Sequence, residues 1–171
     1  AGLSDTIANR VTLRSGFYMA KKTYSAEPGD YHPPYGYWTY NTNLQRVDAD
    51  CKVYEIPLAA SYNIKQSKNH NWLAGIGFST FLMKSETYNY LYKNSQGQTI
   101  YRGWTLRNKN NHFFSVLTIS GGYQYRINHH LSIIAEPYLK LPLHGIGFGK
   151  IKLNSSGLLF TASIQPFTKR K

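Results

Sequence analysis

The sequence predicts an all-β fold, an antiparallel up-and-down transmembrane β-barrel, from three observations. Apolar and polar residues alternate with a period of two in six segments, which is the spacing of a strand with two unlike faces. Short polar connections alternate with longer ones, so the two longest loops gather at one end. Charged residues stand inside a very apolar run, as Glu136 and Lys140 do within residues 131–167. A membrane barrel accommodates such charges because its apolar face contacts lipid and its polar face lines the lumen.

The predicted strands cover residues 10–22, 52–64, 72–92, 112–127, 131–143 and 150–167. In the last of them Leu158, Phe160, Ala162 and Ile164 share one face, and Gly157, Leu159, Thr161 and Ser163 share the other. Prolines such as Pro57 and Pro137 remove a donor from the strand ladder, so we expect bulges or bends near them.

The connections define two ends of the predicted barrel. Short polar turns lie at 65–71 and 128–130, and long outer loops are expected at about 23–51 and 93–111. The segment HGIGFGK, residues 144–150, is interpreted as a tight hairpin between the last two strands. The whole chain, residues 1–171, is interpreted as a single domain, which is long enough to bury a core.

The expected size of the barrel is about eight strands, because the smallest outer-membrane barrels have eight and only six are clear here. Residues 1–9 resemble the end of a strand followed by a short turn. One interpretation is that an N-terminal hairpin is missing from this chain. The alternative is that residues 1–9 and the aromatic segment YGYWTYNTN, residues 35–43, supply further strands.

The charges on the polar faces predict an ionic network in the lumen, formed by Arg14, Glu55, Glu136 and Lys140. An unpaired charge in a narrow interior costs several kcal/mol, so pairing is expected. Residues four apart on one strand lie ~13 Å apart. We therefore expect Glu136 to find its partners on neighbouring strands rather than in Lys140.

The composition is strongly basic and aromatic, with a formal net charge of +12 and 15 tyrosines. The basic residues near the long-loop ends of the strands are expected to face the phosphates of lipopolysaccharide; they are Lys21, Lys22, Lys84, Lys93, Arg102, Arg107 and Lys109. No recognised motif supports a nucleic-acid partner. No apolar run reaches the ~18 residues of a membrane helix, and residues 1–10 lack the features of a signal peptide.

The remaining motifs predict neither a cofactor nor a metal site. Cys51 is the single cysteine and is interpreted as an inert thiol. His129 and His130 are adjacent, so on a strand they would point apart. The glycines of GIGFG, residues 145–149, lack the Lys-Ser/Thr pair of a phosphate-binding loop.

Four stretches together are similar to a known family: KVYEIPLAASYNI, WLAGIGFSTFLMKSETYNYLY, FSVLTISGGYQYRI and AEPYLKLPLHGIGFGKIKLNSSGLLFTASI. Over residues 10–167 the chain resembles the outer-membrane β-barrel proteins of the Bacteroidota, the group known as outer membrane protein beta-barrel domain. The resemblance implies a porin-like, eight-stranded barrel in the bacterial outer membrane, exported by a signal peptide and without catalytic residues. Phe167, close to the C-terminus, is the kind of terminal aromatic that barrel assembly reads, although the residues TKRK follow it.

The expected function is a non-enzymatic outer-membrane barrel, acting as a structural or accessory subunit of an outer-membrane assembly. Its expected partners are outer-membrane lipid, lipopolysaccharide and other outer-membrane proteins. The candidate partner-binding residues lie in the loop PPYGYWTY: Tyr35, Tyr37, Trp38 and Tyr40. Free conduction is not expected, because side chains fill an eight-stranded lumen.

Two alternatives make different structural predictions. A barrel enzyme acting on lipid requires a His, a Ser or an acid gathered in a notch that lipid can reach. A soluble ligand-binding barrel requires Leu158, Phe160 and Ile164 to point inward.

Overall fold

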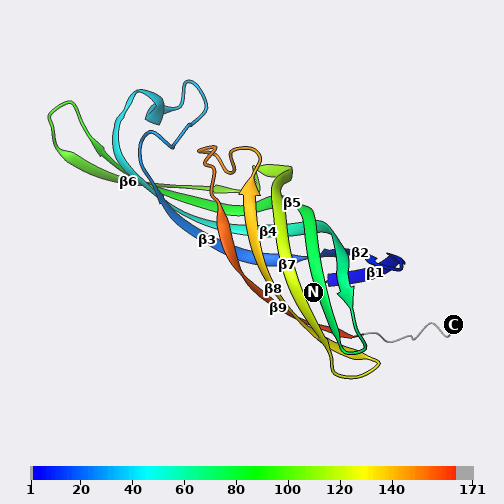
Figure 1. Cartoon of the computed structure of the whole chain (residues 1–171). Helices are drawn as coiled ribbons and strands as arrows, with labels where there is room; N and C mark the ends of the chain where they lie inside the picture. The colour runs from blue at the N-terminus through cyan, green and yellow to red at the C-terminus, as the bar shows by residue number, and fades with distance from the viewer. Residues whose placement is uncertain (1, 165–171) are drawn as a thin grey trace.

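The computed structural model describes residues 2–164, which form one curved antiparallel sheet and a single 3-10 turn (Figure 1). The elements are β1 (Gly2–Ala8), β2 (Val11–Gly16), β3 (Tyr18–Ala26), η1 (Trp38–Asn41), β4 (Asn43–Gln66), β5 (His70–Lys93), β6 (Thr99–Arg107), β7 (Asn111–Arg126), β8 (Leu131–Pro142) and β9 (Ser155–Ile164). In this part of the chain no helix is long and apolar enough to cross a membrane. Phe167 and the residues after it lie outside the described part.

The sheet follows chain order, as expected for up-and-down topology. Its main path is β1-β2-β4-β5-β7-β8-β9, while β3 pairs with β4 and β6 pairs with β5. The strands β2 and β3 are two parts of one predicted strand, interrupted at Phe17, and β4 pairs with both. The all-β antiparallel class is therefore confirmed.

The structure differs from a closed barrel of about eight strands. Residues 2–164 contain nine strands, and the sheet that they form is not closed, because within this range β1 and β9 each have a neighbour on one side only. Residues 2–8 form a strand and turn at Asn9 into β2, so the N-terminal segment does contribute to the sheet.

The two predicted outer loops are largely wrong. Strand β3 continues to Ala26 and β4 begins at Asn43, so the first loop shrinks to residues 27–42. Strand β6 occupies most of the second, joined to β5 by a turn at 94–98 in which Gly97 has a φ of +77°. The long β5 offers a free backbone edge there, and the β-forming residues of β6 pair with it.

Two local predictions in the loops are also wrong. Residues 35–43 do not form a strand, since η1 covers Trp38–Asn41. The segment 144–150 does not join β8 to β9 as a tight hairpin; it belongs to a loop, residues 143–154, in which a turn at 147–150 is closed by one isolated antiparallel bridge between Ile146 and Ile151. Gly147 and Lys150 adopt positive φ in this loop, which bends it away from a regular two-strand ladder.

The two faces of the long strand β4 exchange polarity near Val53. On the concave face, buried apolar residues of the N-terminal half give way to buried polar ones: Val47, Ala49, Cys51 and Val53, then Glu55, Ser61 and Asn63. On the convex face the change is opposite: Asp48, Asp50 and Lys52, then Tyr54, Ile56, Leu58, Tyr62 and Ile64. The convex face is thus polar in the upper half, towards β6, and apolar in the lower half.

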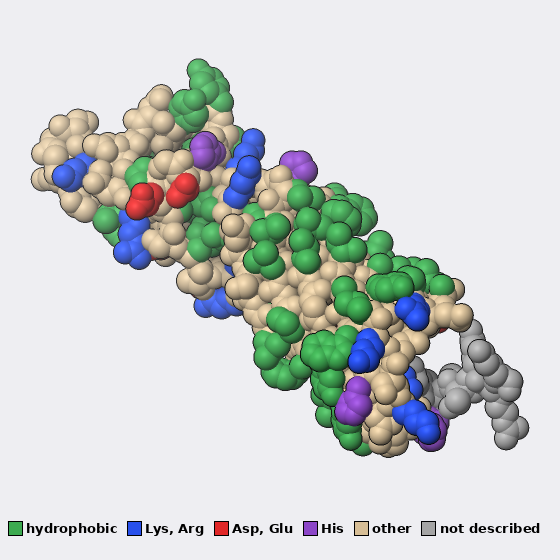
Figure 2. Space-filling model, viewed as in Figure 1, with side chains coloured by type: hydrophobic (Ala, Val, Ile, Leu, Met, Phe, Trp, Pro, Cys, Tyr) green, Lys and Arg blue, Asp and Glu red, His purple; other side chains and the backbone are tan. Residues whose placement is uncertain are grey.

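The convex surface of the lower half carries exposed large apolar side chains, which we call the apolar belt. Figure 2 shows hydrophobic side chains spread over this part of the visible surface. The belt comprises Leu13, Met19, Ile56, Leu58, Tyr62, Ile64, Trp72, Ile76, Phe78, Ile119, Tyr125, Ile133, Leu139, Leu158, Phe160 and Ile164. Phe160 is 68% exposed and Leu139 is 42% exposed, whereas Glu55 and Glu136 are 5% and 4% exposed.

This sidedness does not meet the expectation of a soluble ligand-binding barrel. Leu158, Phe160 and Ile164 are 54%, 68% and 73% exposed, so they do not point inward. The conventional hydrophobic core lies instead in the upper half, where Val47, Cys51, Val53, Tyr88 and Tyr90 are almost fully buried.

Candidate functional site

The interior of the lower half contains a bidentate ion pair between Arg14 and Glu136. The two guanidinium nitrogens Nη1 and Nη2 donate to Glu136 Oε2 at 2.7 Å and Oε1 at 2.6 Å. Ser120 on β7 donates to the same carboxylate at 2.6 Å. Strands β2 and β8 are not neighbours in the sheet, so this pair bridges its concave face.

A second ion pair lies between Lys140 and Glu55, on β8 and β4. The distance from Lys140 Nζ to Glu55 Oε1 is 2.5 Å, and Ser79 donates to the same oxygen at 2.6 Å. Each carboxylate thus has one cation and one serine hydroxyl, which together offset the cost of burial.

All four residues predicted for the interior network take part in these two pairs. Glu136 does not pair with Lys140, as the spacing along the strand indicated. The expectation that the partners lie on neighbouring strands is met for Ser120 but not for the cations, which reach across the curved sheet. Gly75 helps to make room, because a Cβ there would lie 2.4 Å from Ser120 Oγ and 3.5 Å from Arg14 Nη2.

A third buried carboxylate, Glu86, was not foreseen from the sequence. It is 1% exposed and accepts three hydrogen bonds, from Tyr88 Oη at 2.7 Å, Asn110 Nδ2 at 2.6 Å and the backbone N–H of Phe148 at 2.8 Å. Burial, with Tyr24 and Glu86 nearby, raises the pKa of Tyr88 well above its ordinary value, so its hydroxyl remains a donor.

These bonds attach the loop 143–154 to the inside of the upper half. The imidazole Nε2 of His112 also accepts the N–H of Gly147, at 2.9 Å. The sequence did carry a signal: Glu86 has the same parity as the inward aromatic residues Tyr88 and Tyr90. An acid at such a position needs donors, and the loop supplies one of the three, the N–H of Phe148.

Gly147 is expected to tolerate no larger residue without loss of stability. It has a φ of +75°, and an added Cβ would lie 2.8 Å from Tyr88 Oη and 2.9 Å from Glu86 Oε2. Gly147→Ala should lower the free energy of unfolding by about 2 kcal/mol, from backbone strain and displacement of these groups. Gly97→Ala is the matched control, since Gly97 has a φ of +77° and open space around its Cα. Urea unfolding followed by tryptophan fluorescence compares the two, and equal losses would contradict the steric part of the account.

The four candidate residues of the aromatic loop PPYGYWTY form two pairs, of which one packs against the upper half and the other is exposed. Tyr37 packs on Trp104 and Phe148, with ring centroids 5.1 and 4.8 Å apart. Trp38 packs on Tyr90 at 5.3 Å and lies under the guanidinium of Arg102 at 4.8 Å.

The other two candidate residues of this loop face outward. Tyr35 is 90% exposed and Tyr40 is 53% exposed, and their rings meet edge to face with centroids 5.2 Å apart. Of the four candidate partner-binding residues, this pair is exposed, whereas Tyr37 and Trp38 are half-buried.

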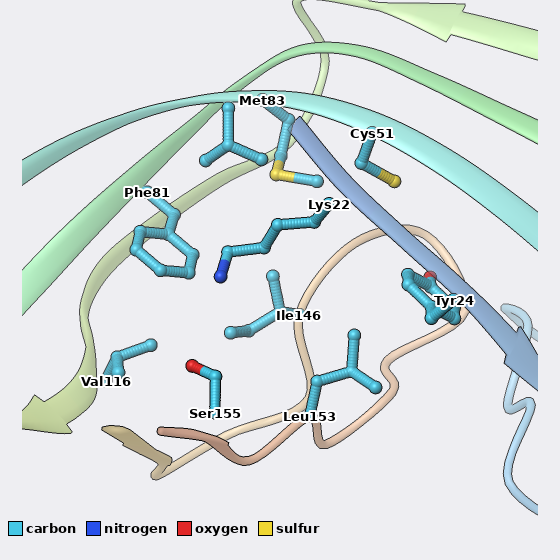
Figure 3. Close-up of a pocket in the computed structure, with 10 residues that line it drawn as sticks. Lys22, Tyr24, Cys51, Phe81, Met83, Val116, Ile146, Leu153 and Ser155 are labelled. Carbon is cyan, nitrogen blue, oxygen red and sulfur yellow. The ribbon is translucent and has the colours of Figure 1, made fainter. Parts of the chain in front are cut away.

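The interior of the upper half leaves a small apolar cavity of about 30 Å³ (Figure 3). The amine of Lys22 points into it, 5.4 Å from the ring centroid of Phe81. Such a volume holds about one water molecule, so no lipid or cofactor fits. A larger open cleft beside the loop 143–154 is lined by His112, His144, Lys150 and Lys152 among others.

Cys51 lies beside the same small cavity and is expected to be chemically inert. Burial, followed by the nearby carboxylate of Glu86, raises the pKa of its thiol to about 12. At pH 8 almost no thiolate forms in the folded chain, so a disulfide reagent should label Cys51 only after denaturation. Stoichiometric labelling of the native protein within minutes would contradict this burial.

Comparisons with protein-family models, curated proteins and solved structures find no match to this chain.

Proposed function

We propose that this chain is a non-enzymatic outer-membrane β-barrel protein of the Bacteroidota type that serves as a structural or accessory subunit of an outer-membrane assembly. The observation that carries the proposal is the exchange of polarity between the two faces of β4 near Val53. A sheet entirely in water has no reason to turn its apolar face outward along half its length.

The length of the apolar stretch supports a membrane location. On β4 it extends from Tyr54 to Ile64 on the convex face, which matches the ~9–11 residues of a tilted spanning strand. The concave face of the same stretch carries the ion-paired Glu55 and the small or polar residues Ala59, Ser61 and Asn63. This is the apolar-out and polar-in pattern of an outer-membrane strand.

The interior supports a structural role rather than catalysis. Glu55 and Glu136 are each saturated by a cation and a serine. His112, the histidine beside the buried Glu86, uses its Nε2 to accept the N–H of Gly147. These groups hold the fold together and are not arranged to activate a nucleophile.

The exposed pair Tyr35 and Tyr40 supports a role in an assembly. Two rigid aromatic rings at the end of the molecule away from the belt offer contact area at low entropic cost. Their backbone is held in place because Tyr37 and Trp38, between them, are packed into the upper half.

The test is fractionation of the native organism's envelope, followed by purification in mild detergent and identification of copurifying proteins. We expect the chain in the outer membrane with at least one stoichiometric partner, lost in Tyr35→Ala/Tyr40→Ala. Tyr101→Ala, at an exposed tyrosine of β6, is the matched control. Recovery as a lone monomer would remove the subunit role, and recovery from the soluble fraction would remove the membrane location as well.

A further inference from the structure

A row of basic residues crosses four strands on the convex face at one level of the sheet. The register places Lys21 of β3 opposite Lys52 of β4, Lys52 opposite Ser85 of β5, and Ser85 opposite Arg107 of β6. A register shift on β5 next to this position adds the exposed Lys84. We call Lys21, Lys52, Lys84 and Arg107 the basic row.

The basic row is costly to the isolated fold. Like charges directly opposite on neighbouring strands destabilise a sheet, and Lys21 and Lys52 are such a pair. Only Lys21 has an acidic partner, Asp50 at 2.7 Å, in a pair whose side chains remain 61% and 39% exposed. Among residues 2–164, Lys52, Lys84 and Arg107 form no ion pair, so the row keeps most of its positive charge.

The position of the row points to its ligand. Two residues below it, about 6.6 Å along the strands, the convex face carries Met19, Tyr54 and Leu82. These apolar residues mark the upper limit of the apolar belt. In a bilayer, lipid phosphates lie directly above the hydrocarbon region, at the height of the row.

We propose that the basic row binds the phosphate groups of anionic lipid headgroups, and so fixes the height of the protein in the membrane. This inference rests on the proposed membrane location and goes further by naming the ligand and the residues. The lipid supplies the negative charge that the row needs beyond the one carboxylate of Asp50. A polyanion in water would not require the row to lie directly above an apolar surface.

The experiment uses the full chain reconstituted in vesicles of phosphatidylcholine alone or with added phosphatidic acid, and measures lipid retained after detergent extraction. Lys52→Gln and Arg107→Gln should each weaken retention of phosphatidic acid about fivefold. Lys93→Gln is the matched control. The sequence grouped Lys93 with the residues expected to face phosphates, but it is the last residue of β5, far along the strand from the row, so this change should alter retention by less than twofold. Inorganic phosphate should not compete at equal concentration, because the lipid is held by its chains as well.

Lys52→Glu separates ligand binding from structure. It places opposite charges across from each other at positions 21 and 52, so thermal stability in neutral detergent should rise while retention of phosphatidic acid falls. Equal retention of phosphatidic acid by the native chain, Lys52→Glu and Arg107→Gln would overturn the inference. If retention is equal but the native chain inserts into neutral vesicles, only the lipid-binding inference fails and the proposed membrane location stands. If the native chain inserts into neither kind of vesicle, the proposed membrane location fails as well.

Discussion

Replacing Arg14 with alanine is expected to lower the free energy of unfolding by about 3–5 kcal/mol. The guanidinium supplies both hydrogen bonds of the pair with Glu136, at 2.7 and 2.6 Å. Without it, the carboxylate remains buried, and the hydroxyl of Ser120 still donates to it. Urea unfolding of the protein in phospholipid vesicles, followed by tryptophan fluorescence, measures the change.

The controls distinguish loss of this pair from general loss of positive charge. Arg10→Ala removes a cation from the exposed turn between β1 and β2 and should change stability by less than about 0.5 kcal/mol. Arg14→Met/Glu136→Leu removes both charges and should recover most of the loss. A loss below about 1 kcal/mol in Arg14→Ala would mean that water reaches the carboxylate.

Placing an arginine at Ile76 is expected to cost about 2–4 kcal/mol when the protein is folded in a bilayer. Ile76 is 55% exposed on β5, between Ala60 of β4 and Ile119 of β7, and so lies within the apolar belt. If the belt faced water, replacing an exposed side chain would change stability by about 0.5 kcal/mol at most. The large cost therefore depends on lipid around the belt.

Thr87→Arg is the matched control for Ile76→Arg. Thr87 is on the same face of the same strand, but above the basic row, opposite Asp50 and Thr105. It should cost less than about 0.5 kcal/mol in the same vesicles. Equal losses of unfolding free energy in Ile76→Arg and Thr87→Arg would contradict the proposal that β5 passes from lipid into water between these two positions.

The lower half was predictable because its two faces differ sharply in sequence. The alternation of Phe160 with Leu159 and Thr161, and of Glu136 with its apolar neighbours, assigns one face outward and the other inward. The structure confirms this sidedness through the exposure of Phe160 and the burial of Glu136. The pairing of Arg14 with Glu136 required the curvature of the sheet, which alternation does not encode.

The upper half was harder to predict because its polarity is reversed. There the inward residues include Tyr88 and Tyr90, while outward positions carry Asp48 and Asp50. On β6 the apolar face of Ile100, Trp104 and Leu106 is interrupted by Arg102, so the alternation is weak, and that segment was interpreted as a loop. The fold of residues 143–154 depends on Glu86, far away in sequence, and local pattern could not reveal it.

The most direct test of the central claim is a depth measurement with single nitroxide labels in a Cys51→Ser background. Labels at positions 76 and 160 in the belt, and at 50 and 87 above it, are compared in reconstituted vesicles by their collision rates with oxygen and with a water-soluble nickel chelate. We predict that oxygen dominates at 76 and 160 and the nickel chelate at 50 and 87. Dominant collisions with the nickel chelate at all four positions would place the belt in water and contradict the account.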